Sequence, residues 1–283
     1  MSAALALLAS ALWGAADFYG GALSRRLHVF TVVFVSQAVA LVVFGAGGLL
    51  TGALETGGPY LIWGTAAGIA GPLALFAFYR ALAVGRMGVV APLAATGVAV
   101  PVLFGVVSGE RPSAGQVAGM VAVVVGIVLA AGPEARGGTA ASIGLALAAA
   151  LGFGLVFVFL AEGGASDAYA TIVVQRAVNV VLVGAVLAAM VLAGAGYRGR
   201  TPGRLLLAHL PLLAFVGVAD AAANLAYAVA SRHGLISITA VLASLYPVVT
   251  AVLARYLHRE RLRPVQVTGA AATMGGVLLL AAA

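Results

Sequence analysis

The sequence predicts an all-α integral membrane protein. Of its 283 residues, 63% are hydrophobic and only 8% are charged, and the mean hydropathy is +1.15. A soluble domain carries about 25% charged residues, so most of the surface of this chain has to face lipid. The 38 glycines are typical of tightly packed membrane helices, because small residues let two helix backbones approach closely.

Ten apolar segments follow one another along the chain, separated by charged or Gly/Pro-rich stretches. Each is close to the roughly 20 residues that a helix needs to cross the hydrocarbon layer. The expected helices are Ala3–Leu23, Phe30–Leu50, Tyr60–Leu82, Met87–Val107, Ala114–Ala131, Ile143–Ala161, Ala168–Ala193, Leu205–Ala230, Leu235–Tyr256 and Val265–Ala282. No basic residue precedes the first segment, which we therefore interpret as a membrane helix and not as a cleavable signal peptide.

An internal repeat divides these segments into two sets. The repeats align at an offset of 140 residues at their beginnings and 150 residues at their ends. The matched positions are Trp13-Gly14 with Phe153-Gly154, Glu110-Arg111 with Glu260-Arg261, Gly119 with Gly269, and Gly126 with Gly276. We therefore predict two domains, 1–132 and 140–283, with five helices each.

Five helices per repeat have a geometric consequence. Because five is odd, the second half enters the membrane from the opposite side, so the two halves have inverted topology around a central cavity. Inverted repeats are typical of secondary transporters, whose substrate site lies near the bilayer midplane between the repeats.

The arginines predict an orientation. Loops after the odd-numbered helices hold twelve of the 15 arginines, and the other loops hold two. The positive-inside rule then places both termini outside the cell. The net charge of +7 is spread over these loops and forms no single patch, so we do not expect nucleic-acid binding.

Several of these motifs resemble a known family. Trp13-Gly14, Glu110-Arg111, Tyr246-Pro247 and Glu260-Arg261, in this order within a 5+5 repeat, are similar to the EamA group of the drug/metabolite transporter superfamily. The segment WGAADFYGG at 13–21 resembles one bacterial subgroup. The resemblance covers the whole chain and implies a monomeric exporter or exchanger of metabolites, amino acids or drugs in the bacterial inner membrane. Many relatives are drawn with both termini in the cytoplasm, whereas the distribution of arginines in this sequence predicts both termini outside.

Three charged residues lie deep inside the expected helices, away from their ends: Asp17, Arg176 and Asp220. Such groups are expensive in a membrane and are functional candidates by default. Burial disfavours the charged form of a carboxyl, so Asp17 is a candidate for substrate contact or for coupling transport to protons. Alternatively, Asp17 pairs with Arg176 or Arg80, or caps a broken helix.

Asp220 shares one helix face with Asn224 and Tyr227, because spacings of four and seven residues bring side chains together. This face is a candidate cavity wall or a source of interhelical hydrogen bonds. Arg176 lies beside Gln175 and one turn before Asn179, and its counterpart in the first half is Gln37. Arg176 either binds a carboxylate or phosphate of a substrate or forms a permanent ion pair with Asp17 or Asp220.

Aromatic residues and prolines complete the candidate site. The rings either line a pocket or anchor helix ends at the membrane interface. They are Trp13, Tyr19, Phe76, Tyr79, Tyr227 and Tyr246. Prolines inside helices permit kinks that would let a helix act as a gate. These are Pro72, Pro92, Pro101 and Pro247.

The leading functional hypothesis is a secondary transporter of small molecules that is driven by proton coupling or by exchange. The alternatives are a membrane-embedded enzyme with an Asp17/Asp220 aspartyl dyad and a channel. The chain has no lysine, which excludes a Walker A motif, and no cysteine, which excludes disulfides and thiolate ligands. The four histidines are not spaced as a metal site, so we expect neither metal nor cofactor. Glu110 and Glu260 are expected to pair locally within their loops.

Overall fold

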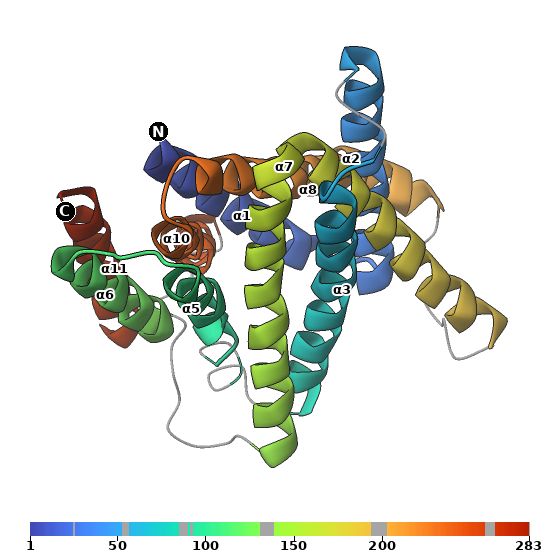
Figure 1. Ribbon diagram of the computed structural model, residues 1–283. Helices are drawn as coiled ribbons and strands as arrows, with labels where there is room; N and C mark the ends of the chain where they lie inside the picture. The colour runs from blue at the N-terminus through green and yellow to red at the C-terminus, as the bar shows by residue number, and fades with distance from the viewer. Residues whose placement is uncertain are drawn as a thin grey trace.

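A computed structural model describes residues 1–24, 26–52, 57–84, 90, 93–130, 139–193, 203–257 and 264–282 (Figure 1). All regular elements in these ranges are helical, which confirms the all-α class. The helices are α1 (Ser2–Ser24), α2 (Val29–Thr51), α3 (Tyr60–Val84), η1 (Thr96–Val98), α5 (Ala99–Val107), α6 (Ala114–Ala130), α7 (Ala140–Leu192), α8 (Gly203–Arg232), α9 (Ile236–Ala243), α10 (Tyr246–Leu257) and α11 (Pro264–Ala282).

Five helices of the described part, α1, α2, α3, α7 and α8, are long and apolar enough to cross a membrane. Four shorter apolar stretches accompany them: Leu93–Val107, Ala114–Leu129, Ile236–Thr250 and Pro264–Leu280. Many large apolar side chains are exposed, as Leu50 and Leu192 are, which fits a surface covered by lipid. The chain is thus built as a multi-pass membrane protein, whereas the total of ten helices stays a prediction.

Helix α7 covers two of the expected helices. Its 53 residues are more than twice the length of one crossing. Asp167 interrupts it with non-helical backbone angles (φ −152°, ψ 106°), and in Figure 1 the helix bends and changes direction. The Asp167 carboxylate accepts a hydrogen bond from the backbone N–H of Ala170 (2.8 Å) and thus caps the second part. The expected boundary between Ala161 and Ala168 therefore exists, but as a kink without a loop.

The expected single helix Leu235–Tyr256 is wrong, because it consists of α9 and α10 with a break at Ser244 and Leu245. Pro247 has no backbone N–H and cannot donate to the carbonyl of Ala243, so the helical ladder stops there. The fourth expected helix is also irregular: the 3₁₀ turn η1 precedes α5. Its expected start, at Met87, lies outside the described residues.

Glycines make the closest contacts between helices, and they do so in pairs. In α6 and α11, a Cβ on Gly126 would lie 2.7 Å from the carbonyl oxygen of Gly269, and one on Gly119 would lie 3.1 Å from that of Gly276. The reversed order means that the two helices run antiparallel where they touch, side by side in Figure 1. Backbones approach this closely only where side chains are absent.

A second pair of glycine contacts joins the two halves near their centre. Gly68 of α3 packs against the backbone of Gln175 in α7, and Gly217 of α8 packs against the backbone of Ser36 in α2. Gly68 and Gly217 lie 149 residues apart, and Ser36 and Gln175 lie 139 residues apart. The same contact therefore occurs twice: once with the glycine in the first half, and once with the glycine in the second half.

We predict that Gly217→Ala destabilises the protein, because a Cβ there would meet the Ser36 backbone, which cannot rotate away. The expected loss of unfolding free energy is about 1–3 kcal/mol. Gly45→Ala in α2 is the matched control, because nothing lies within 4 Å of its Cβ position. Denaturation in mixed detergent micelles measures both, and equal stability of the two variants would contradict this packing.

Candidate functional site

A buried polar network joins α2, α7 and α8. Arg176 is 1% exposed, and its Nη1 lies 2.5 Å from Oδ2 of Asp220. The same nitrogen donates to Oε1 of Gln37, and Nε2 of Gln37 donates to Asp220 Oδ2 (3.1 Å). Gln37 and Arg176, which are matched positions of the two repeats, thus hydrogen-bond to each other and share one carboxylate.

Gln175 extends this network along α7 and α8. Its Oε1 accepts hydrogen bonds from Nη2 of Arg176 (3.1 Å) and Nδ2 of Asn224 (3.2 Å). Asn224 lies one turn beyond Asp220, as the spacing predicts. The sequence noted Gln175 only as a neighbour of Arg176, because its junction role depends on how the two helices are rotated. Asn179 is buried one turn further on, near Gly71 of α3.

The hydrogen-bond network shows which carboxylate pairs with Arg176. A guanidinium buried among apolar helices needs a counter-charge, because an unpaired buried charge costs several kcal/mol. The structure supplies Asp220, whose side chain is 27% exposed, and leaves the arginine itself almost wholly covered. Of the two ion pairs that the sequence left open, the structure contains the one with Asp220.

Asp17 behaves differently from this pair. It is exposed in the middle of α1, whereas its neighbours Ala16 (4%) and Phe18 (8%) are buried. Within the described residues its carboxylate makes no hydrogen bond and no ion pair. Its electrostatic neighbours come from three other helices: Tyr79 of α3, Asp220 of α8 and Tyr246 of α10. Asp17 is therefore an exposed carboxylate within electrostatic reach of groups from three other helices.

Four aromatic rings pack together one turn before Asp17. The ring of Trp13 lies 5.3 Å from that of Phe157, 6.1 Å from that of Tyr227 and 6.2 Å from that of Tyr246. Phe157 and Tyr227 are in edge contact at 4.8 Å. We call these four residues the aromatic cluster. It joins α1, α7, α8 and α10 and fills the bundle next to Asp17.

The other candidate aromatics separate into two groups. Tyr79 is 42% exposed and lies within electrostatic reach of Asp17, so it belongs to the surroundings of that carboxyl. Tyr19 packs against Phe215 at 5.5 Å, and Phe76 is 61% exposed on α3. Neither Tyr19 nor Phe76 joins the aromatic cluster.

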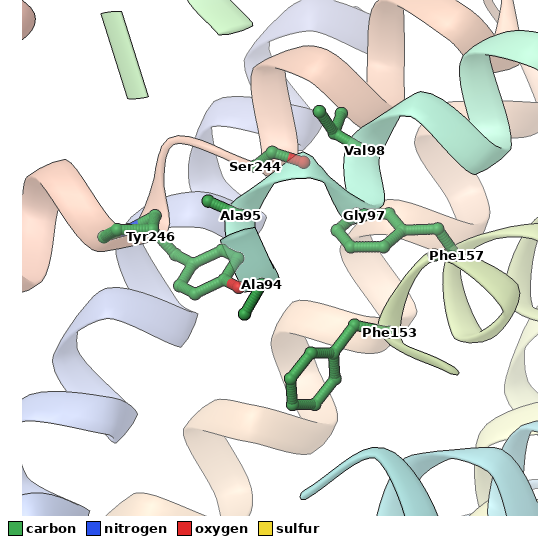
Figure 2. Close-up of a pocket in the computed structure, with 10 residues that line it drawn as sticks. Ala94, Ala95, Gly97, Val98, Phe153, Phe157, Ser244 and Tyr246 are labelled. Atoms are coloured by element: carbon green, nitrogen blue, oxygen red, sulfur yellow. The ribbon is translucent and has the colours of Figure 1, made fainter. Parts of the chain in front are cut away.

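A small pocket lies where the two helix breaks meet (Figure 2). In the picture Tyr246 lies on one side of Ala94 and Ala95, and Phe157 lies on the other side, near Gly97. The full lining is Ala94, Ala95, Gly97, Val98, Phe153, Gly154, Phe157, Ser244, Tyr246 and Pro247. Its open volume of about 10 Å³ has room for about one water molecule. The helices are therefore closed together at this point.

Glu110 links the halves at a helix end, so the expectation of local pairing is wrong for this residue. Its carboxylate accepts hydrogen bonds from the backbone N–H groups of Ile236 and Ser237 (3.0 Å for Ser237) in the first turn of α9. The first N–H groups of a helix lack partners within the helix, and the helix dipole favours a negative charge there. Glu260 lies outside the described residues.

The arrangement defines a class of protein: a multi-pass membrane protein with a polar centre and an exposed carboxyl, Asp17, that has no partner among the described residues. In the described ranges no group of three His, Asp or Glu side chains is arranged to hold a metal. The model of the EamA-like transporter family matches residues 1–132 and 140–282. These matches cover nearly the whole chain, which therefore belongs to the EamA-like transporter family, whose members are transporters and not enzymes.

Comparison with solved structures supports the fold alone. One crystal structure, whose description names no particular protein, aligns with this chain with a TM-score of 0.74 at 20% identity. The alignment covers 98% of this chain and 95% of the other chain. The comparison with curated proteins finds no match.

We predict that Arg176→Gln and Asp220→Asn each destabilise the protein by about 3–5 kcal/mol, because each leaves a buried charge without its partner. The double variant should be less destabilised than the sum of the two, since two neutral amides can hydrogen-bond to each other. Denaturation in mixed micelles, with Glu162→Gln on α7 as the control, measures this coupling. Additive losses would mean that the two groups do not act as a pair.

We also predict that Glu110→Ala speeds amide hydrogen exchange at the start of α9, because Ile236 and Ser237 lose their acceptor. Glu110→Gln keeps one acceptor oxygen and should give an intermediate rate. Peptide-resolved hydrogen exchange in detergent checks this. Unchanged exchange in the alanine variant would show that the cap contributes nothing.

Proposed function

We propose that this chain is a secondary transporter that exports or exchanges a small metabolite, amino acid or drug by alternating access. Membership in the EamA-like transporter family supports transport of small molecules. The substrate would pass between the two halves, 1–132 and 140–283, with each half moving largely as one body.

Paired contacts support the inverted arrangement of these halves. Gly68 on Gln175 repeats as Gly217 on Ser36, and the contact between α6 and α11 is antiparallel with exchanged glycines. A two-fold axis in the membrane plane would generate such exchanged pairs. The hydrogen bond between Gln37 and Arg176 joins matched positions, as expected for residues close to that axis.

The interrupted helices suggest where the motion occurs. The 3₁₀ turn at Thr96–Val98 and the break at Ser244 and Leu245 lie about 150 residues apart, at corresponding places in the two repeats. Interrupted helices at corresponding positions point to the binding site of a transporter. In our proposal both breaks bend as the pocket between them opens and closes.

The accessible carboxyl of Asp17 is the observation that carries the proposed site. It is exposed and has no hydrogen-bond or ion-pair partner within the described residues, which supports its availability to a proton or a substrate. Gln37, Arg176, Asp220 and Asn224 would hold the polar wall beside it.

The remaining site residues would shape the cavity. Trp13, one turn before Asp17, and Tyr79, within its electrostatic reach, would contact substrate, and Tyr227 would support the ring of Trp13. Asn179 would line the passage beside α3.

The arginine-rich loops support an orientation with both termini outside. In our proposal the chain lies in the bacterial plasma membrane as a monomer, and its partners are the bilayer, the substrate and protons. The alternative of an enzyme with an Asp17/Asp220 dyad loses support, because Asp220 forms an ion pair with Arg176. In an aspartyl dyad the two carboxyls would instead share a proton with each other. For a channel, no lining of repeated carbonyls or charged rings favours ion selectivity in the described part.

Transport itself tests this function. Purified protein is first heated with a panel of amino acids, sugars, nucleosides and organic cations, since a bound substrate raises the melting temperature. The most stabilising compound is then radiolabelled for uptake into proteoliposomes. A carrier shows saturable uptake that unlabelled compound inside the vesicles accelerates, and a channel does not.

We predict that Asp17→Asn abolishes this uptake or uncouples it from the pH gradient, while the protein stays folded. Asp167→Asn is the matched control, because it also removes one carboxylate and asparagine still caps the second part of α7. Unchanged pH-dependent uptake by the Asp17 variant would refute the role of Asp17.

A further inference from the structure

We infer that the substrate carries a positive charge and that this charge occupies the carboxylate of Asp17 in competition with a proton. The inference rests on the proposed transport function and narrows it to organic cations, such as compounds with an ammonium group. The distribution of charge in the polar centre carries it.

The negative charges in the polar centre outnumber the positive charges. Two carboxylates, Asp17 and Asp220, and one guanidinium, Arg176, lie in the described centre of the bundle. With all three groups ionised, their sum is −1. The single positive charge balances only one of the two negative charges.

Arg176 is enclosed by its partners and is not accessible to Asp17 or to a ligand in this structure. Its Nη1 binds Asp220 and Gln37, its Nη2 binds Gln175, and the whole side chain is 1% exposed. An anionic substrate would have to displace these partners to reach the guanidinium. The Nε of Arg176 makes no hydrogen bond within the described residues but is buried, so a substrate carboxylate or phosphate could reach this donor only if the surrounding helices moved apart.

The groups that interact electrostatically with Asp17 bring no positive charge. They are Asp220 from α8, Tyr79 from α3 and Tyr246 from α10. Arg80 follows Tyr79 on α3 but makes no ion pair with Asp17. Within the described residues, the protein itself leaves the charge on Asp17 unbalanced.

A charged side chain in the middle of a membrane protein is unfavourable unless another charge neutralises it. A proton or a cationic ligand removes this cost, and one carboxylate cannot hold both at full strength. An anion at the same place would face like charge, which is also unfavourable.

The surroundings of Asp17 suit an organic cation. Trp13 lies one turn earlier on α1, and Tyr79 and Tyr246 lie within electrostatic reach. Aromatic rings attract cations through the negative face of the π system. The tyrosine hydroxyls can also accept hydrogen bonds from an ammonium group. An inorganic cation would make no use of the apolar ring surface.

Three probes of similar size and different charge test the inference: phenethylammonium, 2-phenylethanol and 3-phenylpropanoate. Each is titrated into the detergent-purified full-length chain, and binding is measured by calorimetry and by the shift in melting temperature. We expect phenethylammonium to bind at least tenfold more tightly than the other two. Equal affinity for all three, or preference for the anion, would overturn the inference.

The pH dependence supplies a second readout. Because a proton competes for the same carboxylate, cation affinity should weaken as pH falls, by up to about tenfold per pH unit, the limit for one proton. Asp17→Asn should lose both the affinity and this pH dependence, and Asp17→Glu should retain them. Asp167→Asn, which removes a carboxylate from the kink of α7, should bind as the wild type does. Cation binding unaffected by Asp17→Asn would place the ligand elsewhere and contradict the assignment.

Binding and transport fail in distinguishable ways. Cation binding at Asp17 without counterflow in proteoliposomes would refute the transporter proposal and leave the ligand class standing. Counterflow of a neutral or anionic compound that does not need Asp17 would leave the transporter standing and refute the ligand class. The comparison of the three probes uses only the wild-type chain, so the inference can be tested even if an Asp17 variant fails to fold.

Discussion

The ion pair between Arg176 and Asp220 sets the constraint around which the centre of this protein is arranged. A guanidinium cannot remain unpaired among apolar helices, so α7 and α8 must present these two side chains to each other. Gln37 brings α2 to the same carboxylate, and Gln175 adds Asn224. Five polar side chains thereby fix how three helices are rotated about their axes. The apolar surfaces of these helices alone would allow many rotations.

Close backbone packing complements this polar centre. Helices in lipid gain no hydrophobic advantage from association, so van der Waals contact and hydrogen bonds have to hold them together. Glycine provides the contact at Gly126 on α6, Gly68 on α3 and Gly217 on α8, each against the backbone of the other half. Because these contacts join the halves and do not lie within one of them, any motion between the halves has to remodel them.

Two kinds of intramembrane charge therefore coexist. Arg176 and Asp220 neutralise each other and are held by neighbouring amides, which suits a structural role. Asp17 is exposed and unpaired within the described residues, next to the aromatic cluster and to the closed pocket between the helix breaks. In the transport mechanism that we propose, the ion pair would form a fixed wall and Asp17 would be the group that changes partners.

Composition and periodicity alone determined the all-α membrane class, the two-part organisation and the short list of ionisable residues, because the hydrocarbon layer acts on every segment locally. The repeat even identified glycines that later proved to touch, such as Gly126 and Gly269. Only the tertiary structure decided which acid pairs with Arg176, that Glu110 caps α9 of the other half, and that Asp167 kinks a helix without a loop. Those outcomes depend on the rotation and crossing of helices distant in sequence, which a one-dimensional pattern of apolar residues does not encode.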